Sequence, residues 1–175
     1  MKKIIVLLLV VVVLSGCTSK APMITAGALI KDDLIIYDKD FNVVESPFEN
    51  EDGTAYTIGL PGENAWQTAR GVKVGDKLKV IREKYQDCDF KCRSLEYSNQ
   101  VKGISLDEFC DRYEEFKHDD CIDLIFSAEI YGDLEFGIKD GAVDAIHTYS
   151  AAGLELREKA VQEKMKELDE KYAAG

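Results

Sequence analysis

The first seventeen residues impose the strongest constraint on what this chain can fold into. Met1 is followed by two lysines and then by an unbroken apolar run over residues 4–14, after which come Ser15 and Gly16. A short basic start, an apolar stretch and small residues form the pattern of a secretory signal peptide. The run is eleven residues long, whereas a helix that crosses a bilayer needs roughly 20 apolar residues. We therefore expect residues 1–16 to be a cleaved signal rather than a transmembrane anchor.

The residues at the expected cleavage point, Leu-Ser-Gly-Cys, resemble the lipobox of bacterial lipoproteins. In that family the cysteine thiol receives a diacylglycerol, and the signal peptidase then cuts directly before it. The resemblance implies that Cys17 is the lipid-bearing first residue of the mature chain and that Gly16 is the last residue removed. It also implies a cell-membrane protein held on the extracytoplasmic face by fatty acids such as palmitate, each buried methylene contributing about 0.8 kcal/mol. The alternative is an ordinary signal peptide in which Cys17 has no role.

The charge of the chain favours a lipid anchor over an electrostatic one. The full sequence carries 22 basic and 33 acidic side chains, so removal of Lys2 and Lys3 leaves 20 basic against 33 acidic, a net charge of −13. Anionic lipid repels such a protein. Nucleic acid is excluded as a partner for the same reason, because binding it requires basic side chains that neutralise phosphates.

The length of the mature chain predicts a single domain. Roughly 150 residues follow a short tether, which is the usual size of one domain. We assign residues 17–24 to the tether, residues 25–150 to a globular domain and residues 151–175 to a C-terminal helix.

Strands are expected where β-forming residues alternate between turn-forming ones. The segments expected to be strands are a hairpin over residues 34–44, then residues 55–60, 121–131, 134–138 and 143–149. Turns are expected at Gly132-Asp133 and at Asp140-Gly141, the second pair because Asp-Gly tolerates positive φ.

Two helices are expected inside the domain. The first opens with Asp76 as a candidate N-cap. Its apolar stripe consists of Leu78, Ile81 and Tyr85. The second begins at Ser105, which forms a capping box with Glu108. Its apolar face consists of Leu106, Phe109, Cys110, Tyr113 and Phe116.

Two motifs together suggest a family. They are T-x-R-G-x-x-x-G-D beginning at Thr68, followed by a helix ending at Tyr85, and F-x-I-x-D-G-x-V-x-x-I beginning at Phe136. The pair resembles small Gram-positive (Firmicutes-type) lipoproteins of unassigned function, whose fold is similar to the BamE-like and β-lactamase-inhibitor-protein-like modules. The resemblance implies an α+β fold, an antiparallel sheet with helices packed on one face, and binding or assembly roles rather than a shared reaction. The chain departs from the family at Gln86, where glycine is usual, and in the cysteine-bearing residues 88–121.

Arg70 is the charged residue of the first motif. Gly71 and Gly75 allow sharp backbone turns where the chain enters the helix. We expect Arg70 to pair with an acidic neighbour or with the edge of the sheet, as part of the architecture. A ligand-binding role for Arg70 is the alternative.

Four cysteines remain once Cys17 is set aside. Disulfides persist outside the cytoplasm, and four cysteines allow three pairings. We favour the two bridges that close short loops, Cys88–Cys92 and Cys110–Cys121, each stabilising the fold by about 2–4 kcal/mol. The alternatives are free thiols or a metal site with His118, although the spacing does not match a zinc ribbon. We expect no metal and no cofactor.

The sequence carries no recognisable catalytic motif. Neither G-x-S-x-G nor H-E-x-x-H occurs, and these are the usual hydrolase signatures. The chain has two histidines, His118 and His147, and His147 falls in an expected strand as a solvent-facing residue. We therefore expect a non-enzymatic protein, with an unrecognised envelope hydrolase as an alternative.

The C-terminal helix carries an apolar stripe of nearly heptad rhythm. Its members are Leu154, Val161, Met165, Leu168 and Tyr172. Because the stripe covers under three heptads, we expect this helix to pack on its own domain, with a protruding or partner-binding helix as the alternative. The expected function is a lipoprotein that binds protein or envelope components through its sheet face or this helix. A thiol or metal-binding module in residues 88–121 is the second hypothesis.

Overall fold

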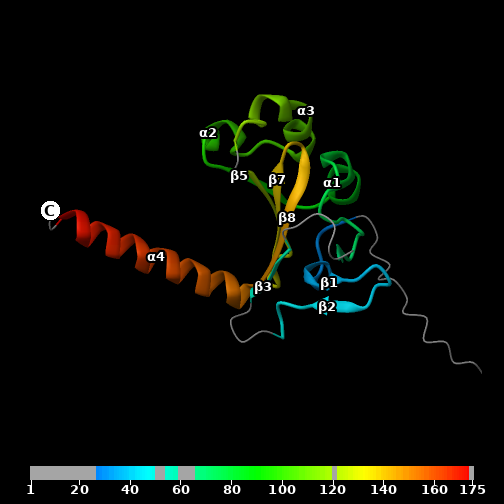
Figure 1. Cartoon of the computed structure of the whole chain (residues 1–175), viewed down its shortest axis with the longest axis horizontal. Helices are drawn as coiled ribbons and strands as arrows, with labels where there is room; N and C mark the ends of the chain where they lie inside the picture. The colour runs from blue at the N-terminus through cyan, green and yellow to red at the C-terminus, as the bar shows by residue number, and fades with distance from the viewer. Residues whose placement is uncertain (1–26, 50–53, 59–65, 120–121, 174–175) are drawn as a thin grey trace, which may run out of the picture.

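The computed structural model describes residues 27–49, 54–58, 66–119 and 122–173. Its fold is α+β, as predicted. The central sheet has five antiparallel strands in the order β3 (Thr54–Ile58), β8 (Ala142–Ser150), β7 (Gly132–Lys139), β6 (Ile122–Ser127) and β5 (Phe90–Ser94). Helices gather on one side of this sheet, and a small second sheet lies near it (Figure 1).

The small sheet contains the predicted N-terminal hairpin. Its strands are β2 (Val43–Glu45), β1 (Ile36–Tyr37) and β4 (Gln67–Thr68), in that order. The turn between β1 and β2 is held by Asp38, whose Oδ1 accepts hydrogen bonds from the backbone N–H groups of Asp40 and Asn42. Aspartate side chains stabilise turns in this way by replacing a backbone acceptor.

The turn between β7 and β8 is the predicted Asp-Gly turn. Asp140 and Gly141 have φ angles of 50° and 70°, which matches the twist that a two-residue hairpin requires. The Gly141 N–H donates to Tyr113 Oη over 2.7 Å. This bond ties the hairpin tip to helix α3 (Leu106–Phe116).

Helix α3 and helix α1 (Leu78–Tyr85) bury the predicted apolar stripes, except that Cys110 of α3 is only half-buried. The Ser105 cap is confirmed, since Ser105 Oγ accepts from the Glu108 N–H over 3.1 Å. The Asp76 cap is wrong: α1 has Lys77 at its N-cap, without a side-chain cap bond. Asp76 instead accepts a hydrogen bond from the backbone N–H of Lys73, because it belongs to the turn before the helix.

Alternation along the strands places the core on one face of the large sheet. The Tyr85 ring of α1 lies 5.0 Å from the Phe126 ring and 5.5 Å from the Phe136 ring, centroid to centroid. The Phe109 ring of α3 lies 6.3 Å from that of Phe90 on β5. The polar residues between these apolar ones therefore point to the opposite face.

Two local expectations were wrong. Gly132 does not lie in the turn but begins β7, and the turn precedes it, closed by the Ala128 N–H to Gly132 carbonyl bond of 2.8 Å. Strand β5 and the short helix α2 (Ser98–Val101) occupy a region read only as a cysteine-bearing insertion. Helix α4 (Ala151–Ala173) begins directly after β8.

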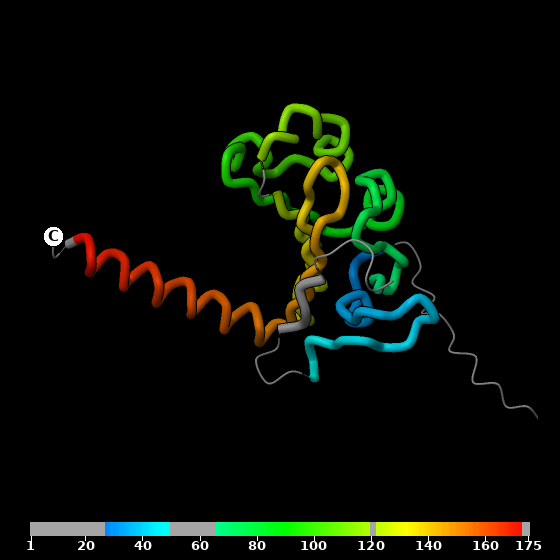
Figure 2. Tube along the Cα trace, viewed as in Figure 1, coloured from blue at the N-terminus to red at the C-terminus, as the bar shows by residue number. Residues whose placement is uncertain are grey.

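Helix α4 leaves the body of the molecule (Figure 1). The trace in Figure 2 shows it running outward from the end of β8, with its C-terminal end far from the other elements. Among the described residues it contacts strands β7 and β8, and its hydrogen bonds to the domain come from Ala151, Gly153 and Arg157, near its start. The expectation that this helix packs along its own domain is therefore wrong.

Candidate functional site

The predicted lipidation residue, Cys17, lies outside the described residues. The first described segment, which begins at Gly27, leads directly into the 3-10 helix η1 (Lys31–Leu34). No helix in the described part of the chain has the length and apolar content needed to cross a membrane.

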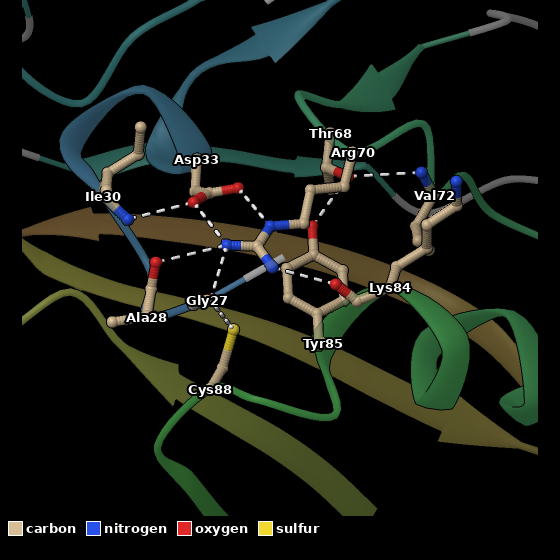
Figure 3. Close-up of polar contacts among 10 residues, drawn as sticks. All are labelled: Gly27, Ala28, Ile30, Asp33, Thr68, Arg70, Val72, Lys84, Tyr85 and Cys88. Carbon is tan, nitrogen blue, oxygen red and sulfur yellow. Dashed lines mark hydrogen bonds and ion pairs between the residues drawn. The ribbon is translucent and has the colours of Figure 1, made fainter. Parts of the chain in front are cut away.

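Arg70 joins this first segment to the domain (Figure 3). Its Nε donates to Asp33 Oδ1 over 2.8 Å and its Nη2 donates to Asp33 Oδ2 over 3.1 Å, a two-point pair in which both side chains are buried. Nη2 also lies within 3.1 Å and 3.3 Å of the carbonyl oxygens of Gly27 and Ala28. The predicted acidic partner of Arg70 is therefore Asp33.

The remaining contacts of Arg70 leave no nitrogen for a ligand. Nη1 donates to the Lys84 carbonyl oxygen over 2.9 Å, and the guanidinium carbon lies 4.8 Å from the centre of the Tyr85 ring. Tyr85 Oη in turn bonds Thr68 Oγ1 over 2.9 Å. All three guanidinium nitrogens are engaged with the protein, so the geometry supports the architectural role and not the ligand-binding one.

The favoured Cys88–Cys92 disulfide is wrong, whereas the favoured Cys110–Cys121 disulfide stays a prediction because it involves a residue outside the described ones. Cys88, Cys92 and Cys110 are free thiols in the described chain, and Cys121 lies outside it. Cys88 Sγ donates to the Gly27 carbonyl oxygen over 3.2 Å (Figure 3), whereas Cys92 is fixed in β5 opposite Leu124. Their different elements hold the two thiols apart, although only four positions separate them.

The environment of these thiols opposes thiolate chemistry. Burial raises the pKa of Cys92 to about 12 and that of Cys110 to about 11, and burial also raises the pKa of Cys88. Metal binding and nucleophilic attack both need the thiolate. Among the described residues no cluster of three or more His, Cys, Asp or Glu side chains could hold a metal ion, and His118 instead lies on an open groove.

That groove runs between α1, α3 and the tip of the β7–β8 hairpin, with a volume of about 610 Å³. Lys77, Lys79, Lys117 and His118 give it a basic rim, and Tyr113 and Leu78 lie among its walls. Lys117 Nζ is paired with Glu114 over 2.7 Å. Because Glu114 and Asp140 also line the groove, its basic side chains are partly offset by acidic ones.

The open face of the large sheet carries a charged network built on Glu135. Its carboxylate is buried, with Oε2 lying 3.1 Å from Arg93 Nη2 and Oε1 lying 2.9 Å from Arg157 Nη1. Arg93 also bonds Asp123 over 2.7 Å. Since Arg93 lies on β5 and Arg157 on α4, Glu135 connects the base of α4 to the edge of the sheet.

Further contacts fix the first turns of α4. The Ala151 N–H donates to the Tyr131 carbonyl oxygen over 2.8 Å, and the Gly153 N–H donates to Ser150 Oγ over 3.1 Å, as at a capped helix start. The guanidinium of Arg157 also lies 4.7 Å from the centre of the Tyr149 ring. The helix therefore leaves the sheet in a defined direction.

Beyond this base the surface of α4 is exposed. From Glu158 to Tyr172 every side chain is exposed. The large apolar ones among them are Val161, Met165, Leu168 and Tyr172. Large apolar groups aligned on an exposed helix are a feature of interaction surfaces rather than of ordinary protein surface.

The sequence identified the apolar stripe of α4 but not its environment, and it identified Arg70 but not Asp33. It missed Glu135 and both of its arginine partners. The only local signal for Glu135 is its place between Leu134 and Phe136, which assigns it to the opposite face of β7 without indicating a partner.

The comparisons with known proteins bear on the N-terminus. A family model of the prokaryotic membrane lipoprotein lipid attachment site matches residues 1–18, a range that includes Cys17. The chain is therefore a membrane-anchored lipoprotein, as the resemblance to the lipobox implied. No curated protein and no solved structure matches it.

Proposed function

We propose that this lipoprotein is a non-enzymatic binding module, held by the lipid on Cys17 at the extracytoplasmic face of the membrane, that contacts another protein chain through α4. The observation that carries this proposal is the exposed apolar stripe on a helix that only its first turns attach to the domain. At 1.5 Å per residue, the 23 residues of α4 span roughly 35 Å. The helix therefore reaches well beyond the domain.

The energetics of an isolated helix support the same conclusion. Most of the stability of protein helices comes from tertiary packing of an apolar face, because nucleation is costly and each residue adds little. Intrahelical ion pairs such as Lys164–Glu167 and Lys166–Glu170 are exposed, so each contributes only about 0.3–0.5 kcal/mol. Packing of the stripe against a partner supplies the missing stabilisation.

The charged groups of the domain support a binding role over a catalytic one. The candidate thiols carry raised pKa values, which opposes the thiol or metal-binding alternative. Glu135 is held between two arginines, with Oε2 lying 3.1 Å from Arg93 Nη2 and Oε1 lying 2.9 Å from Arg157 Nη1, so both of its carboxylate oxygens are engaged by the protein itself. Robust turnover of an envelope substrate by the purified protein would overturn this part of the proposal.

Photocrosslinking in intact cells tests the contact. The full lipidated chain is produced with p-benzoylphenylalanine in place of Met165, and a matched chain carries it in place of Leu95. Both positions are exposed, by 56% and 77%, but Leu95 lies on the domain. We expect an adduct of defined mass from position 165 and none from position 95.

The same adduct from both positions would indicate random collision and overturn the proposal. No adduct from position 165 or from the neighbouring exposed positions 161 and 168, under irradiation that crosslinks a control complex, would also overturn it.

A further inference from the structure

The exposed stripe of α4 has the spacing of a coiled-coil seam. Val161, Met165, Leu168 and Tyr172 follow one another at intervals of four, three and four residues. This places Val161 and Leu168 at d positions of a heptad and Met165 and Tyr172 at a positions. Leu154 occupies the preceding d position, at the base of the helix. The exposed fractions of the four are 56%, 56%, 37% and 80% in that order.

The seam is narrow, and its width indicates the kind of partner. A helix that covers a globular core shows a broader apolar face, whereas a stripe limited to a and d positions suits one facing helix. A membrane surface is a poor fit, since α4 carries six acidic and five basic side chains and lacks the basic excess that anionic lipid attracts. The occupant of the seam is therefore a helix.

The charges beside the seam indicate which helix pairs with α4 and whether the two helices run parallel or antiparallel. The g positions are all basic: Arg157, Lys164 and Lys171. The e positions are acidic or amide: Glu155, Gln162 and Asp169. In a parallel pair each g residue faces the e residue five positions later on the other helix, so Lys164 faces Asp169 of the second copy on both sides of the seam. In an antiparallel pair g faces g and e faces e, which sets lysine against lysine.

We propose that α4 pairs in parallel, in register, with α4 of a second copy of this chain. This inference rests on the proposed use of α4 as the contact surface and names its partner. The paired region begins at Val161, because the preceding a position is Glu158 and because Glu135 holds Arg157 at the base of the helix. Because α4 leaves the end of β8 and runs outward (Figure 1), a parallel pair places both domains at the same end of the two helices.

The membrane anchor compensates for the short seam. Two heptads give a weak coiled coil in solution, because isolated helices of that length are marginal. Two lipid-anchored copies on one membrane meet at a high effective concentration, which strengthens a weak contact without adding any new one. The pair is therefore expected on the membrane and is much weaker for the same chain in dilute detergent solution.

Cysteine crosslinking of the full lipidated chain in membranes tests the pairing. Tyr172→Cys lies at an a position near the end of the helix, where only a parallel, in-register pair brings the two copies of this position together. Glu170→Cys is the matched control, because it is an exposed f position two residues away that faces outward from the seam. With a mild oxidant we expect a disulfide-linked species of twice the chain mass from Tyr172→Cys and at least fivefold less from Glu170→Cys.

Charge exchange tests the seam without changing its apolar residues. Lys164→Glu places two acidic side chains opposite each other on both sides of the pair, and we expect it to lower the Tyr172→Cys dimer by about fivefold. Adding Asp169→Lys reverses both charges, restores the complementary pairs and is expected to return the dimer to its original level. Rescue by the second change separates a contact between copies from a loss of helix.

Three results would overturn the inference. They are equal crosslinking of both cysteine variants, failure of the charge exchange to rescue, and a disulfide that forms only between Val161→Cys on one copy and Tyr172→Cys on the other, which indicates an antiparallel pair. An adduct from position 165 with a different protein and no dimer would overturn the inference and leave the proposed function standing. The absence of any adduct from α4 would overturn both.

Discussion

The Arg70–Asp33 pair allows a quantitative test of how the N-terminal segment is held. Replacing Arg70 by methionine keeps most of the aliphatic stem but removes every nitrogen that bonds Asp33, Lys84, Gly27 and Ala28. The Asp33 carboxylate would then stay fully buried without its opposite charge. Breaking one side of a buried pair costs about 3–5 kcal/mol.

The expected loss is large for a domain of this size. Each kcal/mol shifts the melting temperature by about 2–4 °C for a domain of 150 residues or more, so Arg70→Met should lower it by roughly 6–20 °C. Urea unfolding of a chain that begins at Thr18, followed by the fluorescence of Trp66, measures the free energy of unfolding. Trp66 is the single tryptophan and packs against the core.

Arg82→Met is the matched control. Arg82 also bonds two carboxylates, those of Asp107 and Asp111, but all three side chains are far more exposed than those of Arg70 and Asp33. Its loss should therefore cost much less, because solvent screens exposed ion pairs. The reasoning is refuted if Arg70→Met costs no more than Arg82→Met. The same reasoning requires the double variant Asp33→Leu/Arg70→Met to lose less free energy of unfolding than the two single variants lose together, because the double variant leaves no unpaired buried charge.

Three further predictions concern other parts of the domain. Burial lowers the pKa of His147, so as the pH falls the unfolded chain takes up the proton before the folded chain does. The free energy of unfolding should therefore decrease as the pH drops below about 6.5. Urea titrations repeated from pH 7.5 to 5 measure this decrease, and His147→Gln should remove the part that is due to His147. Gly132→Ala would place a Cβ 1.9 Å from the Tyr149 carbonyl oxygen, so it should prevent folding or cost several kcal/mol. Gly103→Ala is the control: its Cβ would lie in open space at φ +78°, so it should cost only about 1–2 kcal/mol. Melting curves followed by circular dichroism measure both losses. Iodoacetamide at pH 8 should alkylate Cys92 and Cys110 far more slowly in the folded protein than in urea, because burial raises their pKa values to about 12 and about 11. Comparable alkylation rates in the two conditions would contradict the structure. So would thiols that resist alkylation in urea until a reductant is added.

Local signals in the sequence predicted the elements whose cause is itself local. The Ser105 cap depends on a side chain bonding the backbone three residues away, and the Asp140-Gly141 turn depends on which residues tolerate positive φ. The stripes of α1 and α3 follow from helical spacing. Such effects act within one turn of chain, so a short stretch of sequence contains all the information.

The sequence-based predictions were wrong where contacts with a distant part of the chain determine the local structure. Cys88 and Cys92 are close in sequence, but Cys88 turns toward the carbonyl oxygen of Gly27 and Cys92 belongs to a strand. Gly132 looked like a turn residue, yet it begins β7 because the Tyr149 backbone passes so close that no side chain fits. Proximity along the chain was a poor guide in both cases, since the sheet sets the distances.

The sequence by itself determined that the chain is a membrane-anchored lipoprotein, because a lipid attachment site is recognised as a linear segment before any fold exists. It also determined the apolar stripe of α4, which depends only on helical spacing. Only the tertiary structure decided that this stripe is exposed and that Arg70 is paired with Asp33. Both depend on which surfaces are already covered once residues far apart in sequence have packed, and no pattern within a single element contains that information.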